Sequence, residues 1–388
     1  VYKRQVLARL FLGQAPVGGD AVVGTVGSAW RPEVALDATG GFVVSWISET
    51  DGTVRTRRLD GTTLAWGLEV VVLLPGVRST SLGPDGGFAA TWVDGSLLKG
   101  QRYDPAGVPV GQAFEITWPT HDPLTWGNSV RDESVVMSGS GASTLVWAAS
   151  ATRISNGDRV TSVRAQRFDS GGVAVGGVNI IDTAFAPFVG DYWDVVTNPR
   201  TRADGSGGFF VLYDDQHWDN TVGSEWDRVA AARFAADGSA VFENVFATSP
   251  ECQGCFNRGL AVRPDGDFMA MWTGLSACLY VDGGTGCDPA FTVSDHPPSD
   301  GTRDRADLAF CGSSSDIVAS WVSSDCGAGG PNYCIWARWF ADLPDVFADD
   351  FESGDPGAWS NLTDDEAANF ERSSPTLQSA RSWIDVDE

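Results

Sequence analysis

The chain has 388 residues, 26 of them basic and 51 acidic, which gives a formal net charge of −25 at pH 7. A surface this acidic repels nucleic-acid phosphates, and no apolar run approaches the roughly 20 residues that a membrane-spanning helix needs. Nucleic-acid binding and membrane insertion are therefore not expected. Because 43% of the residues are hydrophobic and 11% aromatic, the chain can bury a core, which excludes wholesale disorder.

The first apolar segment, residues 6–11, is short, contains Arg9 and is followed by no Ala-x-Ala cleavage site. It therefore does not have the pattern of a signal peptide. The same segment matches strands that recur later in the chain. We expect the sequence to begin inside a repeat and to be part of a longer polypeptide.

A short pattern recurs six times along the chain: a turn of small or polar residues, an apolar run, and a closing aromatic residue. The closing residues are 46 to 66 positions apart, and they are Trp46, Trp92, Trp147, Tyr213, Trp272 and Trp321. A second apolar strand follows most copies, for example at 54–59, 98–103 and 163–168. A short strand precedes each copy, and a tight turn with a further apolar strand completes the unit.

Each unit therefore predicts four short strands over about 45 to 65 residues, and no segment shows a sustained helical period. Four-stranded units at this period are typical of a β-propeller, whose blades bury their faces against their neighbours. We predict an all-β chain in which residues 1–343 form a propeller of six or seven four-stranded blades, the N-terminal blade being incomplete. The recurring tryptophans would fill the wedges between adjacent blades. A β-sandwich array is the alternative architecture.

The repeat resembles an uncharacterised repeat of large secreted bacterial proteins, through residues 40–46 (GGFVVSW), 163–169 (VRAQRFD) and 173–177 (VAVGG). This resemblance implies an extracellular propeller and no particular activity. Residues 347–359 (FADDFESGDPGAW) are similar to the opening of C-terminal modules in secreted bacterial proteins. We therefore expect 344–388 to be a short acidic extension, made of a linker and the start of a truncated module. An acidic tail without a fold of its own is the alternative.

All seven cysteines lie between positions 252 and 334. Six of them form sequence-local pairs, in a CxxC motif or around short Gly-rich loops: Cys252 and Cys255, Cys278 and Cys287, and Cys326 and Cys334. We predict three local disulfides, which fit an oxidising compartment and leave Cys311 over. Two alternatives are a zinc site on the first four cysteines and a redox role for the CxxC motif.

Loop lengths give the clearest functional clue. The turns between the first two and the last two strands of a unit are short, whereas the other connections are long and variable. In a propeller the long connections share one face, and variable loops on a rigid scaffold commonly carry binding sites. Three predicted loops gather aromatic, acidic and histidine residues: Trp118, His121, Asp122 and Trp126; Asp191, Tyr192, Trp193 and Asp194; and Asp214, Asp215, His217, Trp218 and Asp219.

Aromatic rings stack on sugar faces, and carboxylates accept hydrogen bonds from hydroxyl groups. We therefore expect a secreted or cell-surface binding module that presents this long-loop face to a glycan or a surface protein. The alternative is a secreted carbohydrate-active hydrolase or lyase that uses Asp residues of the 190–227 loops, although no established catalytic motif is present. The same residues could instead only cap and pack their own loops. No cofactor is required, although clustered carboxylates could bind Ca²⁺.

Overall fold

The computed structural model describes 5–12, 15–25, 29–36, 42–48, 51–60, 63, 65–74, 77–83, 85–94, 97–116, 125–153, 158–186, 192–219, 224–246, 255–263, 266–273, 276–280, 290–293, 306–310, 317–323, 334–340 and 380–382. The regular secondary structure of these residues consists of β-strands. No helix in this described part of the chain is both long enough and apolar enough to span a membrane.

Within the described residues, the strands form a hairpin and six sheets. The N-terminal hairpin consists of β1 (Gln5–Leu12) and β2 (Ala15–Thr25). Blades 1 to 3 are β3 (Ala29–Leu36), β4 (Phe42–Ser48), β5 (Thr53–Leu59) and β6 (Val70–Leu73); β7 (Val77–Leu82), β8 (Phe88–Asp94), β9 (Leu97–Tyr103) and β10 (Pro109–Ile116); and β11 (Thr125–Met137), β12 (Ser143–Arg153), β13 (Arg159–Phe168) and β14 (Ala174–Ala186). Blades 4 and 5 are β15 (Tyr192–Ala203), β16 (Phe209–Asp219), β17 (Ser224–Phe234) and β18 (Ala240–Phe246); and β19 (Asn257–Val262), β20 (Phe268–Trp272), β21 (Ser276–Tyr280) and β22 (Phe291–Thr292). The C-terminal sheet contains β23 (Ala306–Phe310), β24 (Ile317–Ser323), β25 (Cys334–Phe340) and β26 (Ala380–Ser382).

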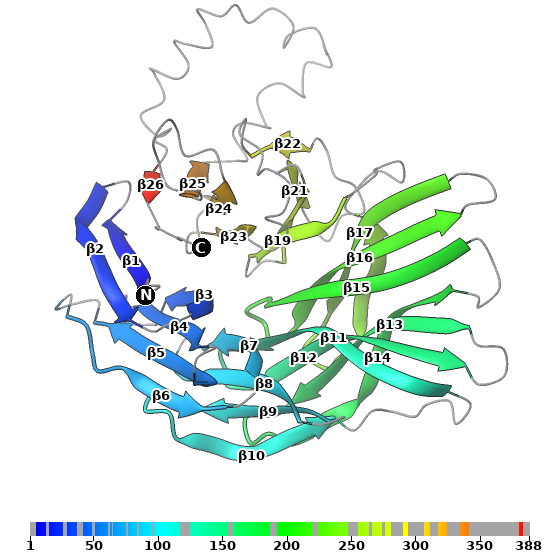
Figure 1. Cartoon of the computed structure of the whole chain (residues 1–388), viewed down its shortest axis with the longest axis horizontal. Coiled ribbons are helices and arrows are strands. Elements are labelled where there is room, and N and C mark those ends of the chain that lie inside the picture. Colours follow the sequence, from blue (N-terminus) through cyan, green and yellow to red (C-terminus); the bar gives the residue numbers. More distant parts are fainter. Residues whose placement is uncertain are drawn as a thin grey trace, which may run out of the picture.

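Each sheet is antiparallel, and its strands pair in chain order. The first strands of successive sheets contact one another, so β3, β7, β11, β15, β19 and β23 form the inner layer. Figure 1 shows the sheets following one another around a common centre. The prediction of an all-β propeller is therefore confirmed.

The predicted number of blades is wrong. Five blades, rather than six or seven, are each built from four consecutive strands of one repeat. In the C-terminal sheet only β23, β24 and β25 come from the repeat, and residues 380–382 join them as β26. The sequence pattern identifies strands but not a pairing partner 40 residues further along the chain. Residues 341–379 lie outside the described residues, so the predicted domain division at 343/344 stays a prediction.

The strands of a blade bury both of their faces, and β16 shows how the sequence achieves this. Successive side chains of a strand point to opposite faces. Phe209, Val211 and Tyr213 pack against blade 3 in one cluster, whereas Phe210 and Leu212 pack against blade 5 in the next. Both faces are apolar because the blade lies between two neighbours, so the strand is a continuous apolar run rather than an alternating one.

The recurring tryptophans have the predicted packing role where their side chains are described. Trp147 of blade 3 is fully buried and packs with Ala89 and Leu98 of blade 2. Trp272 of blade 5 is buried in the cluster that contains Phe210 of blade 4. Large aromatic side chains at one position of each repeat therefore supply much of the apolar area between blades.

The short turns follow one chemical pattern. The Asp169 carboxylate, in the turn between β13 and β14, accepts hydrogen bonds from the backbone N–H groups of Gly171 and Val173, each at 2.9 Å. Gly172 follows with a φ of +82°, and a Cβ there would lie 2.2 Å from the carbonyl oxygen of Gln112 in blade 2. Only glycine combines this conformation with such a close approach, so the turn also packs blade 3 against blade 2.

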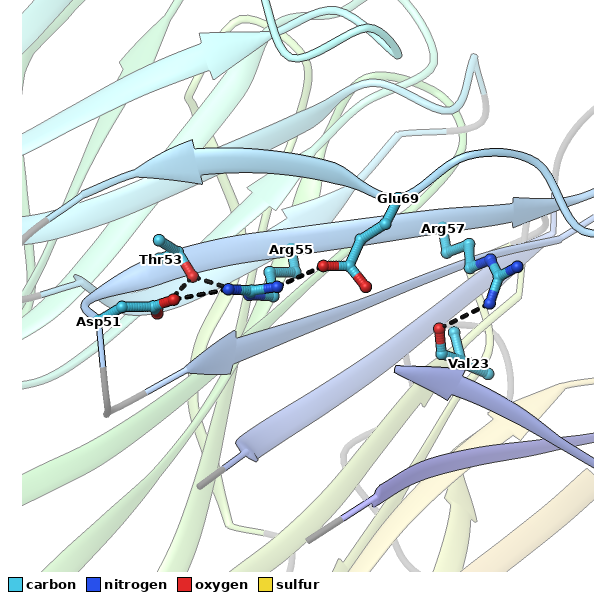
Figure 2. Close-up of polar contacts among 6 residues, drawn as sticks. All are labelled: Val23, Asp51, Thr53, Arg55, Arg57 and Glu69. Carbon is cyan, nitrogen blue, oxygen red and sulfur yellow. Dashed lines mark hydrogen bonds and ion pairs between the residues drawn. The ribbon is translucent and has the colours of Figure 1, made fainter. Parts of the chain in front are cut away.

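One arginine of β5, Arg57, connects blade 1 to the N-terminal hairpin. Figure 2 shows Arg57 Nη1 donating to the carbonyl oxygen of Val23 on β2, at 3.0 Å. Two residues earlier on the same face, Arg55 forms ion pairs with Asp51 and Glu69. Arg57 thus links blade 1 to a backbone carbonyl of the hairpin, whereas the partners of Arg55 belong to blade 1 itself.

Three of the seven cysteines lie among the described residues. Cys255 and Cys278 are buried in the cluster between blades 4 and 5. Cys334 begins β25, and the other four cysteines lie outside the described residues. The three local pairings therefore stay a prediction.

Candidate functional site

The structure places most of the predicted site residues in strands rather than loops. Trp118, His121, Asp122 and Asp191 lie outside the described residues. Trp126 lies near the start of β11, and Tyr192, Trp193 and Asp194 begin β15. Residues 214–219 form the last part of β16. Figure 1 shows β15, β16 and β17 extending together at one side of the molecule, so residues 192–194 and 214–219, predicted as loops, belong to a lengthened blade.

The strand geometry divides the acidic run of β16 between two faces. Its pairing with β17 is regular from Phe209 to Asp219, so the alternation of side chains is unbroken. Asp215, His217 and Asp219 therefore lie on the face toward blade 3, with Tyr213. Asp214 and its alternate neighbours lie on the face toward blade 5. Residues 214–219, which the sequence predicts to form one site, thus lie on two opposite faces of blade 4.

A row of three side chains crosses blade 4 on the face toward blade 3. Asp194 of β15 pairs in register with His217 of β16, which pairs in turn with Trp226 of β17. His217 Nδ1 and Asp194 Oδ1 share a hydrogen bond of 2.5 Å. The rings of His217 and Trp226 are stacked, with centroids 4.9 Å apart and an interplanar angle of 13°. The Asp194 carboxylate thus orients the His217 imidazole, and the stacked imidazole holds the Trp226 indole in place.

Arg228 extends this row along the strands. Its guanidinium carbon lies 3.8 Å from the centroid of the Trp226 ring, and its Nη2 donates to Asp215 Oδ2 at 2.6 Å. We call Asp194, Asp215, His217, Trp226 and Arg228 the rim cluster. Its members are partly buried, and the side chains of His217 and Asp194 keep 22% and 34% of their surface exposed. The cluster is therefore preorganised and still reaches solvent.

The rim cluster continues into a buried polar contact with blade 3. The Tyr213 hydroxyl donates to Asp182 Oδ2 of β14 at 3.0 Å. Burial raises the pKa of Tyr213, and the Asp182 charge adds to that effect. Burial also raises the pKa of Asp215, and the Arg228 charge opposes this rise, whereas the charges of Asp182 and Asp194 reinforce it. Arg228 is therefore the cation that allows several carboxylates to stand close together here.

The opposite face of blade 4 carries a different arrangement. Asp214 is only 2% exposed and accepts hydrogen bonds from Asn198 of β15 and Asn257 of β19. Burial raises its pKa to about 7, although these hydrogen bonds and the Arg258 charge oppose the rise. Gln216 Nε2 donates to Asp227 Oδ1 at 3.0 Å on the same face. Asp214 thus belongs to the junction with blade 5 and not to the solvent-exposed rim.

Sequence reasoning missed two kinds of residue. Arg228 could have been found, because it stands two positions after Trp226 in a strand and must share its face. Asn198 and Asn257 gave no signal, because they lie on other strands and meet Asp214 only through the packing of blades. Asn198 also has a φ of +52° at an irregularity of β15, a conformation that asparagine tolerates better than most residues.

Comparisons with known proteins assign this chain to no family. No protein-family model and no curated protein matches the sequence. Among solved structures, "Hadza microbial sialidase Hz136" is 12% identical with a TM-score of 0.40, over 77% of this chain and 64% of that one. An α-L-arabinofuranosidase, Arb93A from Fusarium graminearum, is 9% identical with a TM-score of 0.47, over 76% and 88%. The WD40 β-propeller domain of Doa1 is 15% identical with a TM-score of 0.35, over 88% and 98%.

The chain has a β-propeller fold. At these identities and TM-scores, the similarities indicate no activity for this chain. The chain spans 64% of the length of the sialidase.

Proposed function

We propose that this propeller is a binding module that holds a glycan at the rim cluster of blade 4. The observation that supports the proposal is the preorganised row of Asp194, His217 and Trp226 at the ends of three lengthened strands. Aromatic edges and faces contact sugar C–H groups, and carboxylate and imidazole groups bond with hydroxyls. A row fixed before binding loses little conformational entropy when a ligand arrives.

The alternative of a glycoside hydrolase has less support. Such an enzyme needs two acids that face the same ligand. Asp214 is buried at the blade 5 junction and lies on the opposite face of β16 from Asp215. On the face toward blade 3, Asp194 and Asp215 are held by His217 and Arg228. This arrangement suits a fixed hydrogen-bonding surface better than a proton-transfer pair.

The test is a glycan-array screen of the folded protein, followed by calorimetric titration of any retained glycan. Trp226→Ala is expected to raise Kd at least tenfold, which corresponds to about 1.4 kcal/mol. Trp66→Ala is the matched control, because Trp66 of blade 1 also lies beneath an arginine, with Arg57 5.6 Å from its ring centroid. The control should bind as the wild type does. A screen that retains no glycan, or equal binding by Trp226→Ala, would contradict the proposal.

The proposal also includes calcium binding and an extracellular location. Among the described residues, no group of three or more His, Cys, Asp or Glu side chains is arranged to hold a metal ion. If carboxylates elsewhere bind Ca²⁺, excess chelator lowers the melting temperature by mass action. An unchanged melting curve would contradict calcium binding. Secretion predicts that the protein isolated without reductant contains fewer than seven free thiols.

A further inference from the structure

Asp214 connects blade 4 to blade 5 through a small set of direct hydrogen bonds. Its Oδ1 accepts from the backbone N–H of Asn257 at 2.6 Å and from Asn257 Nδ2 at 2.8 Å. Its Oδ2 accepts from Asn198 Nδ2 at 2.9 Å. The Asn257 Nδ2 group also donates to the Asn198 carbonyl oxygen at 2.8 Å. Three polar side chains from β15, β16 and β19 thus meet at the start of blade 5.

This contact is sealed from solvent. Asn257 is fully buried, and Asp214 is 2% exposed. The hydrogen bonds to the carboxylate come from amide groups, which are neutral, while the positive charge that acts on it is that of Arg258, the residue after Asn257. Asp227 of β17 lies on the same face and accepts a hydrogen bond from Gln216. A negative charge at Asp214 is therefore only partly compensated.

We propose that Asp214 is a pH-sensitive latch, which holds blades 4 and 5 together more tightly in mild acid than in mild alkali. When the junction opens, Asp214 enters water and regains its ordinary pKa of 3.8. In the closed junction burial raises this pKa to about 7. The closed state therefore binds more protons than the open state between these two values.

The sign of the effect follows from this difference. As the pH rises from about 4 to about 7, the open state gives up its proton first, so the closed state loses stability. Above about pH 7 both states are ionised, and the loss levels off. The opening equilibrium of the junction should thus rise by about tenfold per pH unit between about pH 4 and pH 7, and by about 30-fold between pH 5.5 and 8.

Hydrogen exchange of the Asn257 amide tests the latch directly, because this N–H donates to the Asp214 carboxylate. We expect its protection factor, corrected for the intrinsic exchange rate, to fall about 30-fold from pH 5.5 to pH 8. The internal control is the Val196 amide, which crosses the junction between blades 3 and 4 to the neutral hydroxyl of Thr161 at 3.1 Å. Its protection factor should change little over the same range.

The Asp214→Asn variant keeps an acceptor for Asn257 and removes the titration. Its Asn257 protection should be independent of pH, like that of Val196 in the wild-type protein. A wild-type Asn257 protection that is constant or rises with pH overturns the proposal, and so does an unchanged pH dependence in the variant. The wild-type comparison of the two amides remains decisive even if Asp214→Asn does not fold.

Discussion

Trp147→Ala is expected to lower the free energy of unfolding by about 3–5 kcal/mol, the range for removing a fully buried tryptophan. Trp147 is completely buried and lies in the cluster that joins blades 2 and 3 through Leu98 and Phe168. Alanine leaves a cavity at this junction that the flanking sheets cannot fill without changing their strand pairing. Chemical denaturation followed by circular dichroism measures the change.

Two control variants test the reason for this cost. Within the described structure the Trp147 indole N–H is buried without a hydrogen-bond partner, so Trp147→Phe loses volume but no polar contact. It should cost only about 1–2 kcal/mol. Leu68 is 92% exposed, and Leu68→Ala should change stability by less than about 0.5 kcal/mol. A Trp147→Ala cost below that of Trp147→Phe would show that the tryptophan does not fill the junction.

Asp204→Ala should also be strongly destabilising, by about 2–4 kcal/mol, because it leaves buried donors unsatisfied. Asp204 Oδ1 accepts from the backbone N–H groups of Ser206 and Gly208 at 3.0 and 2.8 Å, in the turn between β15 and β16. Its Oδ2 lies 3.4 Å from Arg233 Nη2, and its side chain is 1% exposed. Alanine therefore deprives the turn and the arginine of the same partner. Denaturant unfolding at neutral pH gives the difference.

The repeat itself supplies the matched control. Asp169 accepts from two turn amides in the same way, but it lies on the surface. Water can replace its carboxylate, so Asp169→Ala should cost about 1 kcal/mol or less. Equal costs at the two positions would mean that burial of the turn does not matter. Asp204→Asn, which retains an acceptor oxygen, should fall between Asp204→Ala and the wild type.

The rim cluster and the latch show how two neighbouring carboxylates acquire different environments. Asp214 and Asp215 are adjacent in sequence, yet one bonds with Asn257 of blade 5 and the other with Arg228 of its own blade. Burial is the first cause of the raised pKa at each, but only Asp215 has a cation in direct hydrogen-bond contact. We expect Asp215 to serve the solvent-facing site and Asp214 the cohesion of the propeller.

Some of the candidate site could be predicted from the sequence. The pattern placed Asp194 and His217 on one side of the propeller, and the structure brings these two residues into contact. It predicted loops for 192–194 and 214–219, where the structure has strands. A polar, aromatic segment is consistent with either state. It becomes a strand here because β15, β16 and β17 lengthen together and satisfy one another's backbone hydrogen bonds.

The sequence by itself determined the kind of fold, because turn residues and apolar runs recur at a fixed order and need only local chemistry to be recognised. The tertiary structure alone decided the number of complete blades, the source of β26 and the face on which each site residue lies. Those features depend on which strands pair and in which register. A pairing partner can lie far along the chain, and one step of register moves a side chain from one blade junction to the other.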